Sequence, residues 1–342
     1  MSNTEQHVFV SIAPSHNKNF EQIIAAKGLS GIKILVNAGH YPFDEKFWSI
    51  VVAGDPMPMR NPSNRGIIKN VKFQVLKIKS YRSTLDTLKR RVPNSQWELY
   101  YCNLEDVLNN YLFFRFRKKT LIKRTLVEDG ILNYYDYRIT RERRRTFQLK
   151  KWVAYFFGMP YNILNGQLSG IDLPEVPDQY VKFPEFALYP EKAIPLGYNE
   201  IKYVADKTKV LFIGQDVLEN VLGHAEYRNL VSSMIQQIQK LTSTENTIYY
   251  KPHRNGNYHV AFGLLKENFG NRVELIQDKS PVEDIVDEIR ACKIFSFFST
   301  ALVNIQMGLD KEQNVLVYSM PFGQVDKKVL KLFEHVGIKI LE

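Results

Sequence analysis

The feature that most constrains the fold of this chain is the regular alternation of short apolar runs with amphipathic stretches. In the first half, strand-like runs occur at His7–Ala13, Lys33–Ala38, Trp48–Ala53 and Trp97–Cys102. Helical spacing occurs between them at Phe20–Lys27 and Ser83–Arg91. Strands that alternate with helices form a mainly parallel sheet with helices packed on it. The first half is therefore predicted to be a doubly wound α/β domain.

The same alternation returns in the second half of the chain. Strands are expected at Lys209–Gly214, Thr247–Tyr250, Val273–Gln277, Lys293–Phe298 and Asn314–Ser319. Helices are expected at Tyr227–Leu241, Val282–Ala291, Ala301–Met307 and Val325–Val336. This pattern predicts a second doubly wound domain, because the period of the apolar residues again switches between strand and helix spacing.

Five prolines interrupt the pattern between Asp172 and Tyr198. Proline lacks the N–H that helices and strand ladders require, so this segment is predicted to be an extended connector. The predicted domains are residues 1–195 and 196–342. In doubly wound folds ligands bind at the carboxyl ends of the strands, so we expect two Rossmann-like domains that face a cleft.

Composition and the amino-terminal sequence predict the cellular compartment of the protein. A chain of 342 residues that is 44% hydrophobic can bury the cores of about two domains. Its amino-terminal residues are polar and lack the apolar stretch of a signal peptide. Cys102 and Cys292 are too few for a zinc site and too distant in sequence to indicate a disulfide. These features predict a cytoplasmic protein.

The net charge of +10 is concentrated in a region that also carries many aromatic residues. The basic runs are Arg115–Lys119, Arg141–Arg145 and Lys150–Lys151. Such a region suits an anionic inner membrane surface or an acidic glycan, and its alternative is a solvated basic face over core aromatics. The sequence contains no nucleic-acid-binding module, so no nucleic-acid partner is expected.

Three short motifs follow predicted strands and carry candidate chemistry. In Glu128-Asp129-Gly130, one carboxylate can face the cleft and accept a proton, while the alternative is a solvated acidic turn. In Lys251-Pro252-His253, an imidazole between cations can bind and protonate a phosphate leaving group. In Ser299-Thr300, hydroxyls at a helix start can cap the helix or bind phosphate.

Two further residues belong to the predicted nucleotide site. Glu283, at a predicted helix start, can accept hydrogen bonds from ribose hydroxyls or simply favour the helix dipole. Gly214 ends a strand, but it stands alone, so the glycine-rich fingerprint of a dinucleotide site is absent, as is a P-loop. No Asp-x-Asp pair occurs at the spacing used by metal-dependent sugar transferases, and no metal is expected.

The order of these motifs resembles that of bacterial sialyltransferases, including the polysialyltransferase and lipooligosaccharide sialyltransferase groups. Those families carry an acidic-acidic-Gly motif, then His-Pro, then Ser-Ser/Thr. Val127–Gly130, Lys251–His253 and Phe298–Thr300 follow that order, and Leu211–Gln215 resembles the first strand of the nucleotide domain. The match departs in one place, because Pro252 precedes His253 and Arg254 follows it.

The resemblance implies a GT-B fold and an inverting, metal-independent transfer of a sialic-acid-type sugar from a CMP donor to a glycan or glycolipid acceptor. It makes Glu128 the general base and Asp129 its support. His253 would bind the CMP phosphate, Ser299 and Thr300 would hold the same phosphate, and Glu283 would bind the ribose. Lys251, Pro252 and Gly214 would complete the donor site.

Other activities fit the same motifs. A transferase for another CMP-activated ulosonic acid shares every motif. A teichoic-acid-type glycerophosphate transferase also releases CMP but would be expected to carry paired catalytic histidines. A third alternative is a non-catalytic glycan-binding protein of the same fold, which would have no activity that depends on Glu128.

Overall fold

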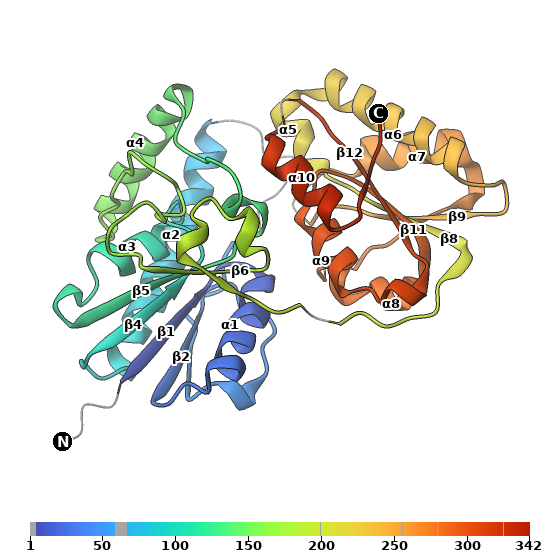
Figure 1. Cartoon of the computed structure of the whole chain (residues 1–342). Helices are drawn as coiled ribbons and strands as arrows, with labels where there is room; N and C mark the ends of the chain where they lie inside the picture. The colour runs from blue at the N-terminus through green and yellow to red at the C-terminus, as the bar shows by residue number, and fades with distance from the viewer. Residues whose placement is uncertain (1–4, 59–66, 199, 255, 279, 324) are drawn as a thin grey trace. The chain divides into compact units, whose positions relative to one another are not determined.

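The computed structural model describes residues 5–58, 67–198, 200–254, 256–278, 280–323 and 325–342. The polar residues 1–4 lie outside this range. The chain forms two compact units, of which the first ends at Gly197 and the second begins at Tyr198 (Figure 1). Each unit carries its own parallel sheet. The predicted α/β class with two Rossmann-like sheets is confirmed.

The first unit is built on a seven-stranded sheet in the order β3-β2-β1-β4-β5-β6-β7, with every neighbouring pair parallel. Its strands are β1 (Gln6–Ser11), β2 (Ile32–Asn37), β3 (Ile50–Val52), β4 (Trp97–Tyr101), β5 (Leu121–Val127), β6 (Asp178–Val181) and β7 (Ala193–Pro195). A parallel order that starts in the middle and reverses direction is the doubly wound arrangement that the alternation predicts.

Helices cover both faces of this sheet. They are α1 (Pro14–Lys27), α2 (Ile67–Arg91), α3 (Val107–Phe114) and α4 (Arg141–Phe156). Successive residues of β1 point to opposite faces: Val8 and Val10 belong to the core beneath α2, α3 and α4, whereas Phe9 packs against Phe20 of α1. Burial on both sides explains why the central residues of these strands, such as residues 8–10 in β1 and 34–36 in β2, are apolar.

The second unit has a six-stranded parallel sheet in the order β10-β9-β8-β11-β12-β13. Its strands are β8 (Asp206–Ile213), β9 (Thr247–Lys251), β10 (Val273–Leu275), β11 (Ala291–Phe297), β12 (Leu316–Met320) and β13 (Lys339–Ile340). Its helices are α5 (Glu219–Leu222), α6 (His224–Leu241), α7 (His259–Phe269), α8 (Val286–Ile289), α9 (Thr300–Gly308) and α10 (Lys327–His335).

Two local predictions are wrong. The proline-rich segment contains β6 and β7, and Pro195 ends β7 at the edge of the sheet, where a missing N–H breaks no ladder. The helix expected at Val282–Ala291 is only a 3-10 turn (Val282–Asp284) followed by α8. Arg290 adopts a left-handed φ of 60°, which ends α8 and directs the chain into β11.

No helix in the described part of the chain is both long enough and apolar enough to cross a membrane.

Candidate active site

The acidic motif lies where four strands of the first unit end side by side. Glu128 and Asp129 follow β5, and the neighbouring strands β1, β4 and β6 contribute His16, Asn103 and Lys182. Because all these strands are parallel, their carboxyl ends meet at one edge of the sheet.

Asp129 is the more accessible carboxylate, with 24% of its side chain exposed. His16 lies fully buried beside it, with Nε2 at 3.2 Å from Asp129 Oδ1. His16 Nδ1 accepts the Ile12 N–H, so Nε2 carries the proton and donates it to Asp129. The Asn103 amide donates to Oδ2.

These contacts set the charge of Asp129. Burial raises the pKa of the carboxyl, but the hydrogen bonds from His16 and Asn103 outweigh it and hold the pKa below the ordinary value. The result is an ionised carboxylate at a strand end, fixed through both oxygens and reachable from solvent.

Glu128 has a different environment. Only 4% of its side chain is exposed, and Oε2 accepts hydrogen bonds from the Tyr134 hydroxyl and, at 2.7 Å, from the Lys182 N–H. The Lys182 ammonium lies 4.0 Å from Oε1. Burial dominates and raises the pKa of Glu128. These contacts make Glu128 a brace between the ends of β5 and β6.

In the second unit, the predicted donor residues follow the adjacent strands β9, β8 and β11. The imidazole-bearing loop after β9 is held by Asp216, which follows β8. Asp216 Oδ2 accepts the His253 main-chain N–H at 2.8 Å. Its Oδ1 accepts the hydroxyls of Tyr227 and Tyr250 at 3.1 and 2.5 Å. Asp216 is fully buried, and burial raises its pKa.

Two glycines allow this arrangement. A Cβ on Gly214 would collide with the Tyr250 hydroxyl, and one on Gly256 would collide with Asp216 itself. Gly214 therefore lets Tyr250 reach Asp216, which explains the isolated glycine at the end of β8 by close packing.

His253 is held as a neutral imidazole. Burial, followed by repulsion from Arg254 and Lys251, lowers its pKa to about 4. The Lys251 side chain is itself buried, and its ammonium donates to the Asp278 main-chain carbonyl beyond β10. Burial lowers the pKa of Lys251. Pro252, which joins them, is half-buried.

The third motif caps a helix at the end of β11. Ser299 is the N-cap of α9, and its hydroxyl accepts the Ala301 N–H at 3.3 Å. Thr300 begins α9. One turn later, the Asn304 amide donates to Glu283 at 2.9 Å, which ties the turn before α8 to α9. Glu283 therefore lies against α9.

Sequence reasoning missed His16, Asn103 and Asp216. Each follows a strand, at the edge where the predicted motifs lie. That position was a usable signal, but none of the three belongs to a short motif, and only tertiary contact joins them to the predicted residues.

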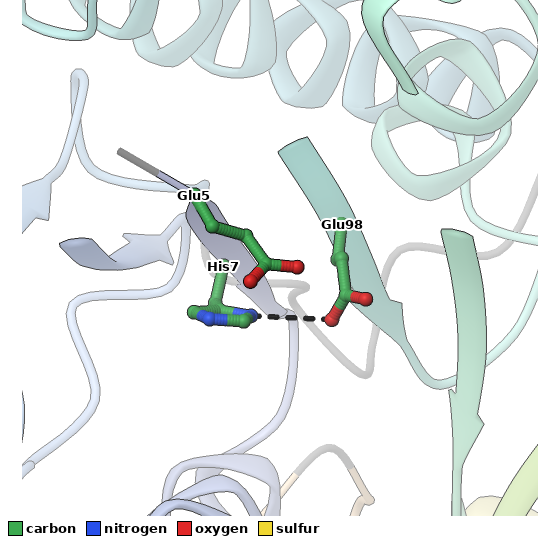
Figure 2. A group of neighbouring side chains, drawn as sticks. All are labelled: Glu5, His7 and Glu98. Atoms are coloured by element: carbon green, nitrogen blue, oxygen red, sulfur yellow. Dashed lines mark hydrogen bonds and ion pairs between the residues drawn. The ribbon is translucent and has the colours of Figure 1, made fainter. Parts of the chain in front are cut away.

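Three side chains of the kinds that bind metals gather at the opposite, amino-terminal edge of the first sheet. They are Glu5, His7 and Glu98, shown in Figure 2. His7 Nε2 donates to the Ser30 carbonyl at 2.9 Å, and Nδ1 lies 3.2 Å from Glu98. The His7 hydrogen bond is the largest influence on the pKa of Glu98 and lowers it. Both ring nitrogens of His7 already have partners within the protein, and we assign no metal to this group.

The fold has relatives among solved structures. An alpha/beta-galactoside alpha-2,3-sialyltransferase from Photobacterium phosphoreum is 11% identical, with a TM-score of 0.51 over 99% of each chain. A 2,6-sialyltransferase from a Vibrionaceae Photobacterium, solved with CMP and lactose, is also 11% identical, with a TM-score of 0.50 over 98% of this chain and 78% of that one. These similarities show a shared GT-B fold. No curated protein sequence matches the chain.

Residues 2–316 match the sequence profile of a family described as "Alpha-2,8-polysialyltransferase (POLYST)". That match covers most of the 342 residues. The resemblance drawn from the motifs is confirmed, and the chain is a sialyltransferase that belongs to the alpha-2,8-polysialyltransferase family.

Proposed function

We propose that this sialyltransferase moves sialic acid from CMP-sialic acid to a glycan or glycolipid hydroxyl, with Asp129 as the proton acceptor. The observation that carries the proposal is the ionised Asp129, held by His16 and Asn103 and open to solvent on one side. The roles implied by the sequence resemblance are thereby exchanged between the two acids. Glu128 is the supporting residue, because both its oxygens face groups of the protein.

The donor phosphate is assigned to the second unit. Helix α9 begins at the end of β11 with Ser299 as its cap, and the positive end of the helix dipole favours a phosphate there. A neutral His253 can donate one ring N–H to a phosphate oxygen. A bound anion would also favour protonation of the imidazole, so His253 can stabilise the leaving phosphate as its charge grows.

The reaction follows from these roles. The acceptor hydroxyl attacks the anomeric carbon while Asp129 takes its proton. The bond between that carbon and the phosphate oxygen breaks, and its electron pair leaves with CMP. A single displacement inverts the anomeric carbon and needs no covalent intermediate. Positioning and hydrogen bonding to the leaving phosphate supply the stabilisation, so we propose that transfer is independent of metal ions.

The acceptor is proposed from the family. The family name specifies an alpha-2,8 linkage between sialic acids, so a glycan that ends in sialic acid is the proposed acceptor. A capsular or lipooligosaccharide chain made at the cytoplasmic face of the membrane meets this description.

A donor panel tests the proposal. The purified protein is incubated with CMP-Neu5Ac, CMP-Kdo or CDP-glycerol, each with and without EDTA, and CMP release is measured with oligomers of alpha-2,8-linked sialic acid or with lactose. We expect CMP release from CMP-Neu5Ac alone, unchanged by EDTA and faster with the sialic acid oligomer. Release only from CMP-Kdo or CDP-glycerol would overturn the donor assignment, and dependence on a metal would overturn the mechanism.

A further inference from the structure

Helix α4 presents a large apolar stripe to solvent, directly opposite the stripe that packs on the first unit. The inner stripe is Arg143, Phe147, Lys150 and Ala154, and the outer stripe is Arg145, Leu149, Trp152 and Phe156. Both follow i, i+4, i+7, i+11 spacing, so they lie on opposite sides of one helix. In Figure 1, α4 lies at the outer side of the first unit.

The inner stripe accounts for the fixed position of α4. Phe147 and Ala154 are buried, and Arg143 pairs with Glu105 at 2.9 Å. The Lys150 ammonium donates to the Glu105 carbonyl, and burial lowers its pKa to about 8. These contacts use the two inward cations, so α4 is a packed element of the unit.

The outer side of α4 exposes large apolar side chains to solvent. Leu149 is 44% exposed, Trp152 60% and Phe156 78%, and Tyr155 beside them is 63% exposed. Large apolar side chains that gather on one exposed face mark an interaction site more often than chance exposure does.

Charge identifies the partner. Among the α4 side chains whose burial the structure describes, the exposed charged ones are cations, namely Arg141, Arg144, Arg145 and Lys151. The neighbouring helix α2 adds exposed Lys72 and Lys79, together with Leu76, which is 43% exposed. A second copy of a chain with a net charge of +10 would be repelled by this face. The partner of a face that is both basic and apolar should be anionic and apolar within a few ångströms. The interface of an anionic lipid bilayer has both properties.

We infer that the outer face of α4 docks the protein on anionic lipid, with Trp152 and Phe156 inserted at the interface and Arg141, Arg144 and Arg145 against the headgroups. The helix lies in the plane of the membrane surface. The inference is independent of the proposed donor and acceptor, because it concerns lipid contact alone.

Vesicle flotation of the full chain tests this. Vesicles of phosphatidylcholine with phosphatidylglycerol are compared with phosphatidylcholine alone, without donor or acceptor. We expect binding to the anionic vesicles only, and weaker binding as salt is raised. Replacing Arg141, Arg144 and Arg145 by Gln should weaken partitioning roughly a hundredfold, since each cation near such a surface contributes about a factor of five. The double variant Trp152→Ser, Phe156→Ser should weaken it at least tenfold.

Matched controls separate a specific face from general charge and apolarity. Lys327, Lys328 and Lys331 on α10 are exposed, and changing these three to Gln removes the same charge elsewhere. Val221 is 77% exposed, and Val221→Ser is the apolar control. Neither control should change vesicle binding. Thermal melting of each variant confirms that the fold is kept.

The fluorescence of Trp152 gives a second measurement. Trp97 is buried and Trp48 half-buried, so Trp152 is the indole expected to shift to shorter wavelength on binding vesicles. Unchanged vesicle binding in both α4 variants would overturn the inference. The inference would also be overturned if the α4 variants lost binding to a soluble acidic glycan but still bound vesicles. That result would make this face a glycan-binding surface. A third contradicting result would be a dimer of the natural chain that is lost in the double variant, with vesicle binding unchanged. That result would make this face a dimer interface.

Discussion

An aspartate lies at the carboxyl edge of each of the two sheets, but the two aspartates have opposite environments. Asp129 in the first unit and Asp216 in the second both follow strands of a parallel sheet, and each accepts hydrogen bonds through both oxygens. Asp129 is partly exposed and its pKa is lowered by His16 and Asn103, although burial opposes this. Asp216 is fully buried and its pKa is raised by that burial.

The difference shows what separates a reacting carboxylate from a structural one. The partner of Asp129 is an imidazole that stabilises negative charge, whereas those of Asp216 are two tyrosine hydroxyls and a main-chain N–H in an apolar core. Asp129 can accept a proton from a substrate. Asp216 instead holds the loop of His253, so it acts on the donor site as a positioning residue.

The largest expected effect distinguishes the two acids of the first edge. Asp129→Asn should lower kcat about a thousandfold, because the general base is lost. Glu128→Gln should lower kcat less than tenfold, since a buried Gln can still accept from Tyr134 and Lys182. CMP release under saturating donor and acceptor measures both. If Glu128→Gln lowered kcat more than Asp129→Asn did, Glu128 would be the general base.

Asp216→Ala should produce the largest loss of stability. It removes the acceptor of two buried hydroxyls and of the His253 N–H, and each unsatisfied buried group costs about 1–3 kcal/mol. We expect the free energy of unfolding in urea to fall by at least about 3 kcal/mol and CMP to bind more weakly. Asp129→Ala should cost about 1 kcal/mol and leave CMP affinity unchanged. Equal losses of stability in the two variants would contradict the division of roles.

Ser299 tests whether the start of α9 binds phosphate as well as being capped. Ser299→Ala removes the cap and should lower the free energy of unfolding by about 1 kcal/mol. Ser299→Asp keeps a capping oxygen but adds a negative charge, so stability should be kept while CMP affinity falls at least tenfold. Isothermal titration with CMP and urea unfolding separate the two effects. If Ser299→Asp binds CMP normally, the phosphate lies elsewhere.

The smallest effect concerns the titration of His253. Its ring protons, followed by NMR, should titrate near the pKa of about 4. Arg254→Gln should move that pKa up towards its ordinary value of 6.5, because a repelling cation is removed. The unfolded chain binds this proton more readily than the native state does, so the free energy of unfolding should decline as pH falls from about 6.5 to 4. An unshifted titration in Arg254→Gln would show that the charge of Arg254 does not contribute to the lowered pKa.

Much of the fold follows from local sequence patterns. The apolar periods at Lys33–Ala38 and Tyr227–Leu241 predicted β2 and α6 to within a few residues, because burial imposes the period of the element directly. The same reasoning missed β6 and β7, which are short and bounded by prolines, and it did not predict α3, α4 or α7. A short strand is recognised by the strand it pairs with, and the partner of β6, β5, is distant in sequence.

The sequence by itself determined the two α/β units and placed the acidic, histidine and serine motifs after strands. It also indicated a basic, aromatic region around α4. Only the tertiary structure decided which carboxylate is accessible and ionised, that Asp216 anchors His253, and that Trp152 and Phe156 point outward while Phe147 points inward. The physical reason is that a strand end is encoded in neighbouring residues, whereas burial and hydrogen-bond partners come from residues up to 113 positions away, as His16 is from Asp129.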